Sequence, residues 1–128
     1  MNRRESISHR NPPFMIKIKR IYEKKSKDDG YRILIDGLWP RGISKEASGV
    51  DLWLRDIAPS PGLRKWFSHD PEKWLTFRER YQLELKDKED LIGKIHQLKK
   101  EKHVITLLYA AKNEMNNNAV VLKDLLAN

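Results

Sequence analysis

Three short runs of strand-type residues alternate along this chain with longer stretches whose apolar residues recur at helical spacing. The runs cover residues 15–22, 31–36 and 104–111. In the first run Ile16 and Ile18 alternate with lysines, which is typical of a half-buried strand, whereas 104–111 is the most apolar run and should be the central strand. Strands separated by helices pair in parallel through right-handed crossovers. The pattern predicts a three-layer α/β domain with a short, mainly parallel sheet flanked by helices, in the general style of Rossmann-like and flavodoxin-like folds.

Capping residues mark the starts of the predicted helices. Ser60 followed by Pro61 opens a short helix, and Asp70 followed by Pro71 opens a longer one. The longer helix carries an apolar stripe at spacings of three and four, made of Trp74, Phe77, Tyr81 and Leu85. A second amphipathic helix is expected over residues 90–100, and the asparagines at 116–118 should cap a last helix. Between residues 44 and 57 the spacing suits either a short helix or a strand, and a helix is favoured.

The composition fits one folded domain of 128 residues, with four Trp and clustered apolar residues despite 34% charged residues. The absence of cysteine excludes disulfides, thiolate nucleophiles and cysteine-ligated metals. No apolar run reaches the length of a membrane span, and the first residues lack the apolar centre of a signal peptide. We therefore expect a cytoplasmic protein without a membrane partner, in which residues 1–14 form a disordered extension and residues 15–128 a single domain.

The net charge of +8 is concentrated toward the amino terminus. Residues 15–32 alone hold seven basic side chains against three acidic ones. Such a basic stripe attracts polyanions, so a nucleic acid is one possible partner. A solvated strand face is the alternative interpretation of the same residues.

The clearest candidate site follows the second run, where the chain reads Asp36-Gly-Leu-Trp39-Pro-Arg41-Gly42. Ligands of open α/β sheets bind beyond the carboxyl ends of strands, and glycines let the backbone approach a ligand closely. Asp36 could move a proton or hold a hydroxyl, Trp39 offers a flat face to a ring, and Arg41 can bind phosphate or carboxylate. The structural alternative is that Asp36 pairs with Arg41 to fix the turn while Trp39 packs in the core.

Two other segments supply candidates for the same site. His69 is a possible acid or base near neutral pH, and Arg64 lies on the helix before it. Tyr109, Lys112 and Glu114 come just after the predicted central strand. If the strands are parallel neighbours, Asp36, Arg41 and Glu114 should meet on one rim of the sheet. A buried structural network of ion pairs among these residues would explain the same pattern without any ligand.

The marked nucleotide and hydrolase signatures GxGxxG, Walker loop, GxSxG and HExxH are missing, and no ligand spacing indicates a metal site. The sequence therefore names no cofactor.

Four segments carry a resemblance to a known family: 32–45 with its Asp-Gly-Leu-Trp-Pro-Arg-Gly core, 53–60 ending Ile-Ala-Pro-Ser, 63–71 with Trp-Phe-Ser-His-Asp-Pro, and 106–112. Together they resemble the YeaO-like proteins of the bacterial domain-of-unknown-function family 488, over residues 15–126. The resemblance implies a small cytosolic α/β domain and no settled reaction. Its motif residues fall here on Asp36, Trp39, Pro40, Arg41, Gly42, Pro59, Ser60, Arg64, Trp66, Phe67, His69, Asp70, Tyr109, Ala111 and Glu114. Where that pattern has a second arginine after the aspartate, this chain has Gly37, which removes one cation.

These observations favour a small-ligand or enzyme domain that takes an anionic, nucleotide-like or phosphorylated molecule. Arg41 and Arg64 would bind the anion, Trp39 would stack on it, and His69 with Asp36 or Glu114 would move protons. Tyr109 and Lys112 complete the expected ligand-binding set. The alternative function is a nucleic-acid-binding or partner-binding module that uses the basic stripe.

Overall fold

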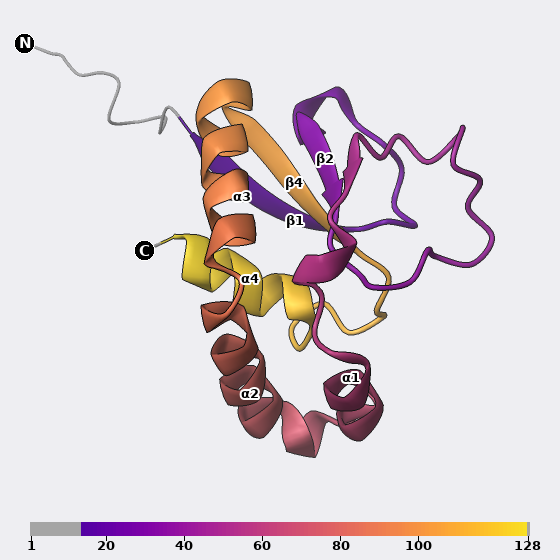
Figure 1. The fold of residues 1–128 in the computed structure, drawn as a ribbon. Helices are drawn as coiled ribbons and strands as arrows, with labels where there is room; N and C mark the ends of the chain where they lie inside the picture. The colour runs from indigo at the N-terminus through magenta and orange to yellow at the C-terminus, as the bar shows by residue number, and fades with distance from the viewer. Residues whose placement is uncertain (1–13, 128) are drawn as a thin grey trace, which may run out of the picture.

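A computed structural model of the chain describes residues 14–127, so the extension predicted for residues 1–14 lies outside the described residues except for Phe14. Four parallel strands form one sheet in the order β1-β4-β2-β3 (Figure 1). The strands are β1 (Met15–Arg20), β2 (Tyr31–Leu34), β3 (Leu52–Trp53) and β4 (Val104–Tyr109). β4 lies between β1 and β2, which confirms the prediction of an apolar central strand there.

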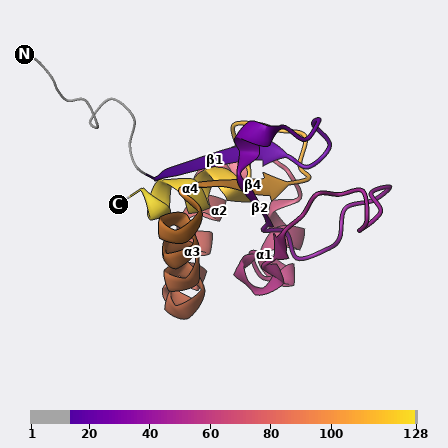
Figure 2. The same cartoon turned by 90° about the horizontal axis from the view of Figure 1, so that it is seen from above.

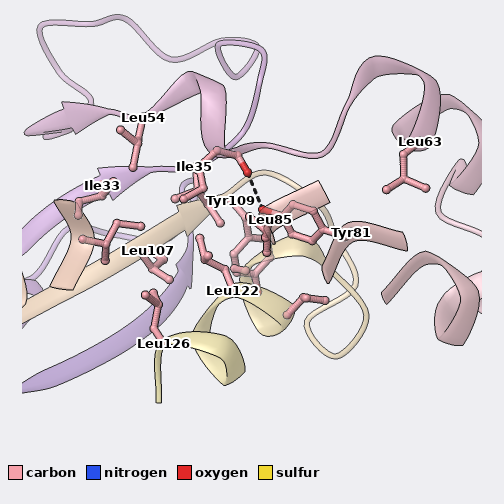
Figure 3. Packing of buried hydrophobic residues seen from close by; sticks show 14 of the residues in the cluster. Ile33, Ile35, Leu54, Leu63, Tyr81, Leu85, Leu107, Tyr109, Leu122 and Leu126 are labelled. Atoms are coloured by element: carbon pink, nitrogen blue, oxygen red, sulfur yellow. Dashed lines mark hydrogen bonds between the residues drawn. The ribbon is translucent and has the colours of Figure 1, made fainter. Parts of the chain in front are cut away.

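The four α-helices within residues 14–127 contribute to one hydrophobic core on the same face of the sheet (Figure 2). They are α1 (Pro61–Phe67), α2 (Trp74–Lys86), α3 (Glu89–Lys102) and α4 (Asn118–Leu126). The strand side chains of this face, among them Ile33 and Leu107, pack on Leu85, Leu122 and other helix residues (Figure 3). The buried hydroxyl of Tyr81 donates a hydrogen bond of 2.8 Å to the carbonyl of Ile57, so this large ring leaves no polar group unpaired.

Loops rather than helices cover the opposite face of the sheet. A second cluster there joins Ile21, Leu34 and Leu108 to partly buried residues that include Trp39 and Trp53. The short 3₁₀ segment η2 (Lys27–Asp29) covers this face near β1, where Lys19 and Thr106 bond to Asp29. The chain is thus a single α/β domain with a short parallel sheet, as predicted, and its second covering layer is built from loop segments.

The favoured helix between residues 44 and 57 is wrong. Turns lead instead to the two-residue edge strand β3 and to the 3₁₀ segment η3 (Arg55–Ile57). The amide of Asp51 donates to the carbonyl of Arg32 at 2.8 Å, and the Asp51 carboxylate accepts from the amide of Arg32 at 2.9 Å. Pairing with β2 therefore outweighs the local preference of this segment for a helix.

The predicted helix starts are confirmed by capping hydrogen bonds. Ser60 Oγ accepts from the amide of Leu63, Asn117 Oδ1 accepts from the amide of Val120, and Asp70 Oδ1 accepts from the amide of Glu72. The last of these caps a 3₁₀ turn, η4 (Pro71–Lys73), which leads directly into α2. None of the helices within residues 14–127 is long and apolar enough to cross a membrane.

Candidate functional site

A cleft of about 820 Å³ opens at the carboxyl edge of the sheet. Its walls come from the ends of three strands: Tyr22 after β1, residues 36–41 after β2, and residues 110–113 after β4. Arg64 of α1 and His69 of the following turn complete the lining. Since parallel strands all point their carboxyl ends the same way, segments far apart in sequence meet at this edge.

Asp36 lines the cleft, and both of its carboxylate oxygens are bound by the protein itself. Its Oδ2 accepts a hydrogen bond of 2.9 Å from the amide of Ala110, and its Oδ1 accepts one of 3.0 Å from the side chain of Asn118. Burial raises the pKa of the Asp36 carboxyl above its ordinary value, although these hydrogen bonds and the charges of Arg64 and His69 act in the opposite direction. Asp36 therefore ties the segments after β2 and β4 to the start of α4, and it does not pair with Arg41.

Arg64 is the least satisfied side chain of the site. Its Nε is buried without a hydrogen-bond partner. Within residues 14–127 its guanidinium forms neither a hydrogen bond nor an ion pair. It lies against Gly37, where an added Cβ would come within 3.3 Å of Nη2. A side chain at this position would crowd the guanidinium, so Gly37 leaves room for Arg64 in the cleft.

Trp39 and Arg41 both line the cleft. Trp39 is held in place, because its Nε1 donates to the carbonyl of Ile43 at 2.6 Å and its ring meets that of Trp53 edge-on at 5.4 Å. Arg41 is exposed, and its backbone carbonyl accepts a hydrogen bond of 3.0 Å from the hydroxyl of Tyr22. Trp39 is therefore a rigid part of the wall, whereas the Arg41 guanidinium is available to a ligand.

His69 and Lys112 are exposed side chains of the same lining. His69 has a backbone φ of 58°, and the preceding Ser68, which ends α1, has a φ of 46°. Two consecutive non-glycine residues in this region are uncommon, and such conformations cluster at functional sites. The turn brings His69 close enough to Asp36 for its charge to act on the carboxyl.

A second, smaller hollow of about 180 Å³ adjoins the cleft and shares Arg64, His69 and Ala111 with it. Phe67 and Phe77 form one part of its lining and the three asparagines at 116–118 another. Sequence reasoning used these asparagines only as a helix cap. A helix cap needs only one residue, so three consecutive asparagines indicate that the other two have further roles.

Two predicted ligand or catalytic residues lie elsewhere. Tyr109 is only 3% exposed and belongs to the core under the helices, where burial raises the pKa of its hydroxyl. Glu114 is exposed and lines neither hollow. Among residues 14–127 no three His, Asp or Glu side chains are grouped to hold a metal ion.

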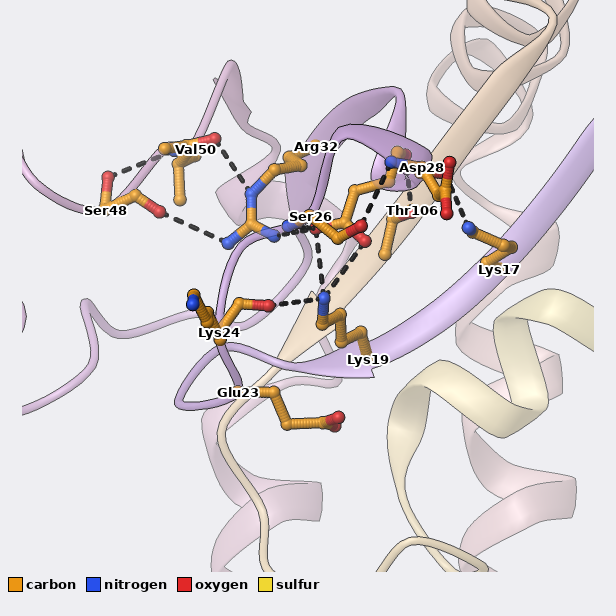
Figure 4. Close-up of polar contacts among 12 residues, drawn as sticks. Lys17, Lys19, Glu23, Lys24, Ser26, Asp28, Arg32, Ser48, Val50 and Thr106 are labelled. Carbon is orange, nitrogen blue, oxygen red and sulfur yellow. Dashed lines mark hydrogen bonds and ion pairs between the residues drawn. The ribbon is translucent and has the colours of Figure 1, made fainter.

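Much of the basic stripe is used inside the fold (Figure 4). Lys17 donates to the carbonyl of Asp28, and Lys19 donates to the carbonyl of Lys24 and to the Asp29 carboxylate. Arg20 bonds to the carbonyls of residues 110 and 111, and Arg32 is 2% exposed and paired with Asp29. Lys24, Lys25 and Lys27 remain exposed.

Comparisons with known proteins assign the chain to a family. The profile of a family described as "Inactive DUF488-N3 subclade" matches residues 15–128. An uncharacterized Escherichia coli (strain K12) protein, YeaO, is 45% identical over 111 residues, which span 87% of this chain and 96% of that protein. An uncharacterized protein of Mycobacterium tuberculosis (strain H37Rv) is 39% identical over 111 residues, spanning 87% of this chain and 92% of its own length. No solved structure matches. The chain therefore belongs to the DUF488 family and is a YeaO-like member of it.

Proposed function

We propose that this chain binds a small anionic ligand, such as a phosphorylated metabolite, in the cleft at the carboxyl edge of its sheet. The observation that carries the proposal is Arg64, whose guanidinium lines the cleft and has no hydrogen-bond or ion-pair partner among the described residues. An anion in the cleft would give the accessible end of this guanidinium a charge-assisted hydrogen-bond partner. Phosphate and carboxylate fit best, because they match the guanidinium fork with two parallel hydrogen bonds.

The charges around Arg64 support an anion. Arg41 and Lys112 are exposed on the same cleft, and the Asp36 carboxylate is already satisfied by Ala110 and Asn118. The cleft thus offers cationic donors while its acidic residue is engaged internally. These residues can clamp an anion without any covalent chemistry.

Binding is favoured over catalysis. The matching family is described as an inactive subclade, and Glu114, the second predicted carboxylate, lines neither hollow. Asp36 has both oxygens occupied, which suits a positioning role. Proton transfer by Asp36, His69 or Glu114 stays a prediction of the sequence.

Isothermal titration calorimetry with inorganic phosphate tests the proposal. Arg64→Gln should weaken phosphate binding by about tenfold or more, since a hydrogen bond to a charged group contributes roughly 1.5 to 3 kcal/mol. Arg41→Ala should weaken it as well, through the loss of an exposed donor. Arg78→Ala is the control, because the Arg78 side chain on α2 is partly exposed and lines neither hollow.

The melting temperature separates a binding role of Arg64 from a structural one. Arg64→Gln removes a half-buried cation that forms no hydrogen bond or ion pair with a described residue and acts on Asp36 only through its charge, so the melting temperature should change little. A marked fall in melting temperature together with unchanged phosphate affinity would show that Arg64 serves the fold and would contradict the proposal.

A further inference from the structure

The smaller hollow next to the cleft has the size and lining of a pocket for one ring. It measures about 180 Å³, and a cavity of about 150 Å³ is enough to hold benzene. A five- or six-membered ring therefore fits with little volume to spare, so a fused two-ring base would have to extend out of the hollow.

The lining has two chemically different parts. Phe67 and Phe77 stack on each other at 4.3 Å between ring centroids and present an apolar surface. Asn116 and Asn118 supply amide groups to the same hollow. Asn118 donates a hydrogen bond from its Nδ2 to Asp36, but its Oδ1 accepts none from residues 14–127. The side chain of Asn116 forms no hydrogen bond with any of these residues. Free amide groups and an apolar surface in one hollow suit a ring with an apolar face and a polar edge.

The position of Arg64 connects this hollow with the anion site. Arg64 lines both hollows, and Ala111 lies on the boundary that they share. A group bound to Arg64 from the cleft is thus adjacent to the mouth of the smaller hollow. One ligand can place its anionic group on Arg64 and its ring between the phenylalanines and the asparagines.

We propose that the ligand of this site is a phosphorylated or otherwise anionic molecule that carries a single five- or six-membered ring, which occupies the smaller hollow. This inference rests on the proposed function, because Arg64 must hold the anionic group. It adds the ligand class: a pentose phosphate or a monocyclic aromatic phosphate, such as a pyrimidine-sized group, in preference to a purine-sized one.

Calorimetry with four probes at one pH tests this class. The probes are inorganic phosphate, ribose 5-phosphate, phenyl phosphate and 1-naphthyl phosphate. At least one of the two single-ring phosphates should bind about tenfold tighter than inorganic phosphate, whereas 1-naphthyl phosphate should gain nothing. A gain for ribose 5-phosphate alone identifies a sugar ring as the occupant, and a gain for phenyl phosphate alone identifies a flat aromatic ring.

Two variants place the ring in the hollow. Asn116→Phe places a bulky side chain in the smaller hollow and should abolish the gain for the ring while inorganic phosphate binds as before, because Asn116 does not line the cleft. Ala47→Phe, at an exposed position outside both hollows, is the matched control. Asn116→Ala removes an amide that bonds to no described side chain, so it should reduce the ring preference without loss of melting temperature. It keeps the test valid if Asn116→Phe does not fold.

The outcomes distinguish the two proposals. If inorganic phosphate binds through Arg64 but single-ring phosphates bind no tighter, the ring pocket is refuted and the anion site stands. Equal gains for the one-ring and two-ring phosphates also refute it. If no probe binds, the proposed function fails, and the ring pocket fails with it.

Discussion

At the scale of single residues, Asp29 is the most consequential charge of the fold. It is 2% exposed and pairs with Arg32, which is equally buried, while Lys19 and the amide of Ser26 also donate to its carboxylate. Asp29→Asn would leave the Arg32 guanidinium buried without its counter-charge. We expect a loss of about 3 to 5 kcal/mol in the free energy of unfolding, measured by urea denaturation. Asp28→Asn, at the exposed neighbouring position, should change it by less than about 0.5 kcal/mol.

The pH dependence of this loss provides a second check. Burial by itself raises the pKa of Asp29, but the hydrogen bonds from Ser26, Lys19 and Arg32 outweigh it and hold the pKa below its ordinary value. The ionised carboxylate therefore stabilises the fold fully above the unfolded pKa of about 3.9, and this contribution is lost as the pH falls through the lower folded pKa. The gap between wild type and Asp29→Asn should narrow below about pH 4. A gap that stays constant there would mean that Asp29 acts by shape and not by charge.

The candidate site shows which residues sequence reasoning can place. Asp36 and Arg41 follow a strand directly, so the rule for carboxyl edges of parallel sheets puts them at the cleft. Glu114 lies five residues beyond the end of β4, where bends redirect the chain, and proximity in sequence no longer fixes where its side chain lies. Asn118 was missed because its contact with Asp36 joins residues 82 positions apart.

At the scale of the elements, two glycines should respond oppositely to alanine. Gly93 lies inside α3, and a Cβ added there would meet no atom within 4 Å, so Gly93→Ala should stabilise the protein by about 0.5 to 1 kcal/mol. Gly30 precedes β2 with a φ of 64°, and a Cβ there would lie 2.3 Å from the carbonyl oxygen of Val104. Gly30→Ala should therefore be strongly destabilising. Thermal unfolding of both variants measures the two effects, and a stabilised Gly30→Ala would show that β2 and β4 can separate without cost.

Elements with strong local signals were predicted well, and an element made by tertiary pairing was not. The stripe of Phe77, Tyr81 and Leu85 identifies α2 because its spacing and burial agree. The segment leading to β3 has no comparable period, and its backbone pairing with β2 makes it a strand. The covering layer opposite the helices was missed for a related reason, since loops that bury Trp39 or Val50 carry no periodic pattern at all.

At the scale of the whole molecule, the basic side chains that produce the formal charge of +8 have different roles. Lys19, Arg20 and Arg32 hold loops to the sheet, whereas Arg41, Arg64 and Lys112 line the cleft. Lys24 and Lys25 are exposed, and their side chains do not line the cleft. Charge counted along the sequence therefore overstates the surface available to a polyanion.

This division predicts how anion binding depends on the stripe. Surface charges are screened over about 8 Å at physiological ionic strength. The double variant Lys24→Gln and Lys25→Gln should therefore change the affinity for inorganic phosphate by less than about twofold. Arg64→Gln should lower the same affinity by about tenfold or more, as argued above. A short single-stranded oligonucleotide is the comparison ligand, measured by fluorescence anisotropy from low to high salt. The contrary result is that the oligonucleotide binds far more tightly than phosphate, with that binding abolished in the lysine double variant and kept in Arg64→Gln. That result would make the basic stripe, and not the cleft, the functional surface. The reason is that binding to a phosphate backbone depends on the number of available cations.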